Sequence, residues 1–73
     1  MSESANLQKG MNALFSGDTD TALRELRPLA KQGNAVAQFG LGVIYNEGRK
    51  GVKKNYIRAH MWWSKAVKID TRK

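Results

Sequence analysis

The sequence predicts an all-α fold in which about four helices form two stacked antiparallel pairs. Apolar residues recur at helical spacing in four stretches, and no stretch alternates between apolar and polar residues as a strand would. The two halves of the chain also match each other. A shift of 31 residues places Gly17 on Gly48, and a shift of 37 places Ala22 on Ala59. The chain is therefore expected to contain a helix–turn–helix unit twice, with a longer turn in the second copy.

The first half contains the first two expected helices. One covers about residues 4–16 and ends at Gly17, and Asp18 is placed to cap the next helix. That helix continues to about Gln32. Pro28 within it predicts a bend rather than a break, because the apolar spacing continues past the proline. The side chains expected in the core of this half are Leu7, Met11, Leu14, Phe15, Ala22, Leu23, Leu26, Leu29 and Ala30.

The second half repeats the plan with two more helices. Asn34 is placed to cap a helix over about residues 35–47, and Asn55 to cap another over about residues 56–69. The inward positions expected in these helices are Ala37, Leu41, Ile44 and Tyr45, followed by Tyr56, Ala59, Trp63, Ala66 and Val67.

Two glycines lie inside the third expected helix. Gly40 and Gly42 each cost helix stability, by about 1 kcal/mol relative to alanine. A sequence that keeps them there predicts that a neighbouring helix approaches closely at these positions.

Three short motifs follow one another over residues 37–67: A-Q-x-x-L-G-x-x-Y-x-x-G, then G-V-x-x-N-Y-x-x-A, then W-W-x-K-A. In this order they resemble the Sel1-like repeat, a tetratricopeptide-like unit. The resemblance covers a full unit over about residues 34–69 and a partial unit over about residues 4–33, in a single domain of residues 1–73. The structural positions of the repeat are Ala37, Leu41, Gly42, Tyr45, Gly48, Gly51, Tyr56, Ala59, Trp63 and Ala66.

The chain departs from the family pattern at several places, including the end of the last expected helix, which lacks the family's A-E-x-G-like ending. Its turn G-R-K-G-V is one residue longer than usual, Asn55 stands where the family has aspartate, and Val67 stands where it has a second alanine. The resemblance implies a right-handed helical stack used for protein–protein contact, often as an adaptor, and it implies no catalytic residue.

The composition also argues against an enzyme. His60 is the single histidine and there is no cysteine, so neither a histidine cluster for a metal nor a thiolate nucleophile is expected. We expect no catalytic residue, no cofactor and no bound metal. No apolar run is long enough to span a membrane. The first residues lack the pattern of a secretory signal, so a cytoplasmic location is expected.

Two helix pairs are few for a repeat protein, because such stacks usually need about three units or polar caps. The apolar end of the stack must therefore be covered by flanking residues, by a partner or by a second copy of the chain. The hypothesis that follows is a small interaction module that binds a protein or peptide, with a homodimer as one form of that binding.

Positive charge suggests an alternative. The net charge is +7, and residues 49–73 hold nine lysines or arginines against one acid. At 100° per residue, Lys54, Arg58, Lys65 and Arg72 share one narrow sector of the last helix, with Lys68 beside it. This basic stripe either keeps the protein soluble or binds an acidic protein surface, with nucleic acid a weaker alternative because no nucleic-acid motif is present. The candidate partner-binding residues are Arg49, Lys50, Lys53, Lys54, Arg58, Trp62 and Lys65.

The two tryptophans are expected to differ. Trp63 points inward and is expected in the core, whereas Trp62 lies between the apolar side of the helix and the basic stripe. Trp62 therefore either packs at the edge of the core or serves as a binding hot spot beside the charges.

Overall fold

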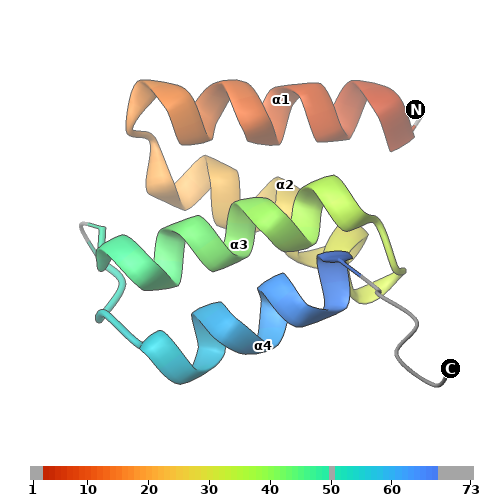
Figure 1. The fold of residues 1–73 in the computed structure, drawn as a ribbon. Helices are drawn as coiled ribbons and strands as arrows, with labels where there is room; N and C mark the ends of the chain where they lie inside the picture. Colours follow the sequence, from red (N-terminus) through yellow and green to blue (C-terminus); the bar gives the residue numbers. More distant parts are fainter. Residues whose placement is uncertain (1–2, 50, 68–73) are drawn as a thin grey trace, which may run out of the picture.

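The chain folds into four helices that stack one on the next. The structure, a computed structural model, describes residues 3–49 and 51–67, and this part of the chain contains helices and no strand. Figure 1 shows the order of the elements. They are α1 (Glu3–Ser16), α2 (Thr19–Lys31), α3 (Ala35–Glu47) and α4 (Tyr56–Val67). The expected all-α fold is confirmed, and the observed bounds lie within about two residues of the expected ones.

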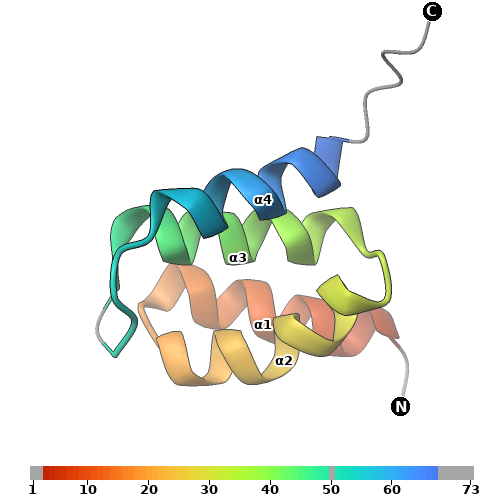
Figure 2. The ribbon, with the colours of Figure 1, turned by 90° about the horizontal axis from the view of Figure 1, so that it is seen from below.

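Each helix packs against the next along the chain. α1 packs on α2, α2 on α3 and α3 on α4, while α1 also reaches α3. Figure 2 shows the consequence for the last helix, which lies along α3 on the side away from α1 and α2. Among the four helices, α4 packs against α3 alone. The last helix therefore has one neighbour, and much of its surface stays exposed.

Side-chain oxygens cap three of the helices as expected. Asp18 accepts a hydrogen bond from the Thr21 backbone N–H at 3.2 Å, and Asn34 accepts one from Ala37 at 2.9 Å. Asn55 accepts one from the Arg58 backbone N–H at 3.0 Å. Each cap satisfies a backbone donor that the first turn of a helix leaves unpaired. In α2 the helix is continuous through Pro28 to Lys31, so the proline does not break it.

The core forms where α1, α2 and α3 meet. Its largest fully buried side chains are Leu14, Leu26, Leu41 and Ile44. Leu26 fits between two helices because they carry glycines at its position. A Cβ atom on Gly10 or Gly40 would lie 2.6 or 2.9 Å from a Leu26 methyl carbon. The close approach expected at Gly40 is thus confirmed. Gly10 allows the same approach on α1, which was not predicted.

Gly42 allows the second close approach, between α3 and α4. A Cβ atom on Gly42 would lie 2.2 Å from Nε1 of Trp63, which is closer than any real contact between these atoms. The expectation for Gly42 is therefore confirmed. The indole of Trp63 lies directly against the α3 backbone, and this contact sets how near α4 comes to α3.

Three expected core side chains are instead exposed. Phe15 is 78% exposed, Tyr56 57% and Val67 58%, and these three expectations were wrong. Phe15 lies beside Leu14 on α1 but beyond the edge that α2 and α3 cover. Tyr56 and Val67 belong to α4, whose single neighbour covers only a narrow sector of the helix. Residues 68 and 69, expected to continue the last helix, lie outside the described residues.

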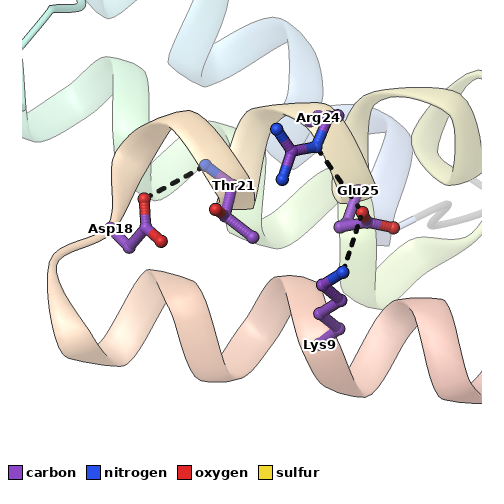
Figure 3. A network of polar contacts seen from close by, with 5 residues as sticks. All are labelled: Lys9, Asp18, Thr21, Arg24 and Glu25. Atoms are coloured by element: carbon purple, nitrogen blue, oxygen red, sulfur yellow. Dashed lines mark hydrogen bonds and ion pairs between the residues drawn. The ribbon is translucent and has the colours of Figure 1, made fainter.

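The cap at Asp18 gives the protein a pH-dependent contribution to its stability. Figure 3 shows Asp18 at the start of α2. Hydrogen bonds from the Thr21 side chain and backbone N–H lower the pKa of Asp18, and the Arg24 guanidinium adds to this effect. A carboxylate with a lowered pKa stabilises the fold above its unfolded pKa of about 3.9 and loses this contribution as the pH falls through the folded value.

We expect the variant Asp18→Asn to lose less stability on acidification than the unmodified protein. Asparagine keeps the capping oxygen but does not titrate in this range. The measurement is the melting temperature of both proteins, by circular dichroism, near neutral pH and at a pH below the unfolded pKa of the aspartate. Other acids, including Glu25 with its ion-pair distances of 3.7 Å to Lys9 and Arg24, are the same in both proteins. An equal loss in both would show that the Asp18 cap contributes no pH dependence.

Candidate functional site

Two surfaces that could hold a partner lie on different sides of α4. Their separation follows from the helical period, because Trp62 and Trp63 are consecutive and point about 100° apart. One surface, the α3–α4 face, is formed by Val36, Phe39, His60, Trp63 and Val67. The other, the α2–α4 groove, is formed by Ala30, Lys31, Gly33, Gln38, Trp62 and Lys65.

The α3–α4 face is mainly apolar, with His60 and Ser64 as its polar side chains, and none of the described residues that form it is a lysine, an arginine or an acid. The indole N–H of Trp63 donates to the Phe39 carbonyl oxygen at 3.3 Å, which joins the two helices at the centre of the face. The His60 ring meets the Trp63 ring edge-on, with 6.1 Å between ring centres. Val36 lies one turn before Phe39 on α3, and these two side chains are about half exposed. A hollow of about 430 Å³ beside Trp63 is also lined by Ser64.

The α2–α4 groove is polar at its rim and apolar at its base. It encloses about 530 Å³ between the end of α2, the start of α3 and the middle of α4. Trp62 is partly buried there and packs against the core. Lys31 and Lys65 are exposed on the α2 and α4 sides of the groove. The groove thus combines an aromatic surface with a cation on either side.

Gln38 lies at the α3 side of this groove and is 4% exposed. Its Nε2 donates to the Ala30 carbonyl oxygen at 2.9 Å, which fixes the orientation of the amide. Its Oε1 is buried and accepts no hydrogen bond from any residue that the structure describes. A buried acceptor without a donor is costly, so this oxygen favours a water molecule or a ligand N–H nearby.

In the structure, the basic residues that were expected to bind a partner have different roles. Arg49 turns inward, donates to the Leu14 carbonyl oxygen and pairs with Glu47 at 2.7 Å. This side chain holds the α3–α4 turn against α1. Lys53 is exposed, and Lys50 lies outside the described residues, as do Lys68 and Arg72.

Two more cations of the stripe lie over tyrosine rings. The Lys54 ammonium is 5.6 Å from the centre of the Tyr56 ring, and the Arg58 guanidinium is 5.7 Å from that of Tyr45. Such contacts hold the cation near the protein surface. Of the candidate partner-binding residues, only Trp62 and Lys65 are brought together in the groove.

The tryptophans also differ from expectation in position. Trp63 was expected in the core, but it is only partly buried and lies on the α3–α4 face. Trp62 packs against the core, which agrees with its expected role at the edge of the core, and it also lines the groove.

Several residues of both surfaces were absent from the sequence-based candidates. Val36 and Phe39 are apolar residues on the outer side of α3, and their spacing of three could have marked them. Lys31 and Gln38 come from different helices and meet only in the folded chain, so no local pattern could have paired them with Trp62.

The described residues hold no group of three or more histidine, cysteine, aspartate or glutamate side chains that could bind a metal ion. None of the helices described is long and apolar enough to cross a membrane.

Comparisons with known proteins match the second half of the chain to one family. The model of the Sel1 repeat matches residues 35–69. Two curated proteins of Arabidopsis thaliana are similar, both described as an ERAD-associated E3 ubiquitin-protein ligase component. HRD3B is 34% identical over 50 residues, which is 68% of this chain and 8% of that protein. HRD3A is 32% identical over 59 residues, 81% of this chain and 9% of that protein. The chain thus spans less than a tenth of either relative, and no solved structure matches it significantly.

Proposed function

Residues 35–69 belong to the Sel1 repeat family, and from this premise we propose that the chain is a small helical interaction module whose α3–α4 face binds a protein surface. Sel1 repeats generally mediate protein–protein contact, and both similar proteins are named as components of a larger ligase assembly. The observation that carries the proposal is the uncharged, exposed apolar surface around Phe39 and Trp63. Contiguous apolar patches of this kind mark interaction sites on proteins in water.

A second copy of the chain is the partner that fits this surface best. The net charge of +7 opposes the association of two copies in any orientation, and this repulsion is weakest where they meet at a face without lysine or arginine, such as the α3–α4 face. The exposed side of α1 is mostly polar, with Gln8, Lys9 and Asn12, and it also carries the exposed Phe15. Head-to-tail stacking of two copies would therefore place the α3–α4 face of one copy against the mostly polar exposed side of α1 of the other. Pairing about a two-fold axis places the α3–α4 faces of the two copies against each other.

The test is the solution mass as a function of protein concentration, by light scattering after size exclusion or by sedimentation. We expect the mass to rise towards that of a dimer, and the variant Phe39→Glu to remain monomeric because it places a charge in each half of the interface. A central aromatic anchor of this kind contributes about 2 kcal/mol or more to binding. The side chain is half exposed, so the fold is expected to tolerate the change.

Phe15→Glu is the matched control, because it makes the same change at an exposed phenylalanine on α1, outside the face. This variant is expected to associate as the unmodified protein does. A monomer at every concentration, or equal disruption by both variants, would contradict self-association through the α3–α4 face. In the first case the face would remain free for a different protein.

A further inference from the structure

The α2–α4 groove lies on a different side of α4, and its chemistry is unlike that of the α3–α4 face. We propose that this groove binds an acidic peptide segment of another protein, with an apolar side chain of the segment against Trp62 and its carboxylates at Lys31 and Lys65. This inference goes beyond the proposed function, because it concerns a different surface and a ligand of different chemistry.

Charge is the first argument for an acidic ligand. Lys31 and Lys65 belong to opposite sides of the groove, and neither forms an ion pair with any described residue. Arg27 lies one turn before Lys31 and lines an adjoining hollow with it, so the positive surface continues along α2. The nearby acid of α2, Glu25, is within 3.7 Å of both Lys9 and Arg24. The cations of the groove are therefore free to pair with carboxylates that a ligand brings.

The aromatic base of the groove is the second argument. Trp62 rests against the core, so its ring is held in place and loses little freedom when a ligand covers it. A tryptophan between two cations is a typical binding anchor, because it supplies apolar area while the cations supply orientation. A hollow of about 530 Å³ is large enough for one or two side chains of a peptide.

The buried acceptor of Gln38 is the third argument. The carbonyl oxygens of Pro28, Leu29 and Ala30 already accept backbone hydrogen bonds from residues 32–34. Gln38 Oε1 is thus the unpaired buried side-chain acceptor beside the groove in the described part of the chain. A peptide carries N–H donors at every residue other than proline, and one of these would satisfy this oxygen once the side chains that cover it shift to admit the donor or a bridging water molecule.

The same features favour a peptide over nucleic acid. Phosphodiester groups present only acceptor oxygens, so a nucleic acid could donate to Gln38 only through a base, whereas a peptide has an N–H donor at every residue other than proline. Nucleic-acid binding also requires a row of cations along the phosphates, and here Arg49 is turned inward while Lys54 and Arg58 lie over tyrosine rings. An acidic segment needs only the two lysines that flank Trp62.

The experiment uses three fluorescein-labelled probes, with binding to the whole chain followed by anisotropy. The probes are a short glutamate-rich peptide with a central phenylalanine, the same peptide with glutamine in place of glutamate, and a single-stranded oligothymidylate of similar length. We expect the acidic peptide to bind most tightly, and its affinity to fall as salt is raised. Binding is also expected to change the emission of Trp62, which can be read alone in the variant Trp63→Phe.

Two double variants with equal changes of net charge locate the site. Lys31→Glu with Lys65→Glu is expected to weaken the acidic peptide about tenfold or more. Lys53→Glu with Lys54→Glu, in the loop before α4, is expected to change the affinity less than threefold. Both pairs are exposed, and circular dichroism will check that each variant is folded.

Three results would overturn the proposal. These are no binding of the acidic peptide, tighter binding of oligothymidylate, or an equal loss of affinity in both double variants, which would show a diffuse basic surface. None of them decides whether the chain self-associates through the α3–α4 face, because Phe39→Glu and Phe15→Glu test that proposal and the linings of the two surfaces share no residue.

Discussion

Replacing Leu26 with alanine is expected to remove about 3–5 kcal/mol of folding free energy. Leu26 is fully buried, and its two methyl carbons contact the positions of Gly10 on α1 and Gly40 on α3. Because both neighbours are glycines, they have no side-chain atoms that could move into the space that the leucine leaves. The change therefore creates a cavity at the point where three helices meet.

This loss is large for so small a protein. A chain of 73 residues is expected to have roughly 4–11 kcal/mol of stability in total, so the variant loses a large share of it and should unfold at a much lower urea concentration. The measurement is urea unfolding followed by circular dichroism at 222 nm (a wavelength that reports helix). Leu23→Ala is the control, since Leu23 lies on the same helix but is only partly buried. A similar cost at both positions would show that the close packing around Leu26 adds nothing beyond ordinary burial.

The second large effect is expected at Gly42. In an unobstructed helix, exchanging glycine for alanine gains about 1 kcal/mol. At Gly42 the added Cβ would overlap the Trp63 indole, so α4 has to move away from α3. We expect a net loss of about 2–3 kcal/mol, which is typical of overpacking. Since α4 belongs to both candidate surfaces, both self-association and peptide binding should weaken as well.

A double-mutant cycle separates steric overlap from other causes. In a Trp63→Ala background the obstacle is gone, so Gly42→Ala should become neutral or stabilising. The measurement is the free energy of unfolding of the four proteins in urea. If Gly42→Ala costs the same in both backgrounds, the indole does not set the distance between α3 and α4.

Most of the fold could be predicted from the sequence because its signals are local. The caps at Asp18, Asn34 and Asn55 each act within three residues, so the starts of α2, α3 and α4 can be read from the chain. Gly40 and Gly42 were also informative, since a helix tolerates such costly residues where another helix must come close.

Burial was harder to predict than helix position. Helical spacing shows which side chains share a face, but it does not show whether another element covers that face. Tyr56 and Val67 follow the apolar spacing of α4 and are nevertheless exposed, because no second helix lies against them in the described structure. For the same reason, Trp63 was expected in the core although it is only partly buried.

The candidate sites depended even more on tertiary structure. Trp62 and Lys65 could be singled out on one helix, but Lys31 joins them from a helix thirty residues earlier in the chain. Arg49 belonged to the basic run in sequence and is drawn away from it by the Leu14 carbonyl oxygen. The count of charges identifies the part of the chain that is rich in lysine and arginine. It does not show which of these side chains remain free to bind a partner.

Because α4 packs on α3 alone, binding at one candidate surface is expected to affect binding at the other. Proteins open locally, and an element held by one interface costs less to release than an element held by two. Both surfaces exist only while α4 is docked on α3, so a ligand at either one stabilises the docked state. Occupying the groove then favours the form of the chain that presents the α3–α4 face, and the reverse holds equally. If both surfaces bind as proposed, the two sites would be coupled through the docking equilibrium of one helix, without any contact between their ligands.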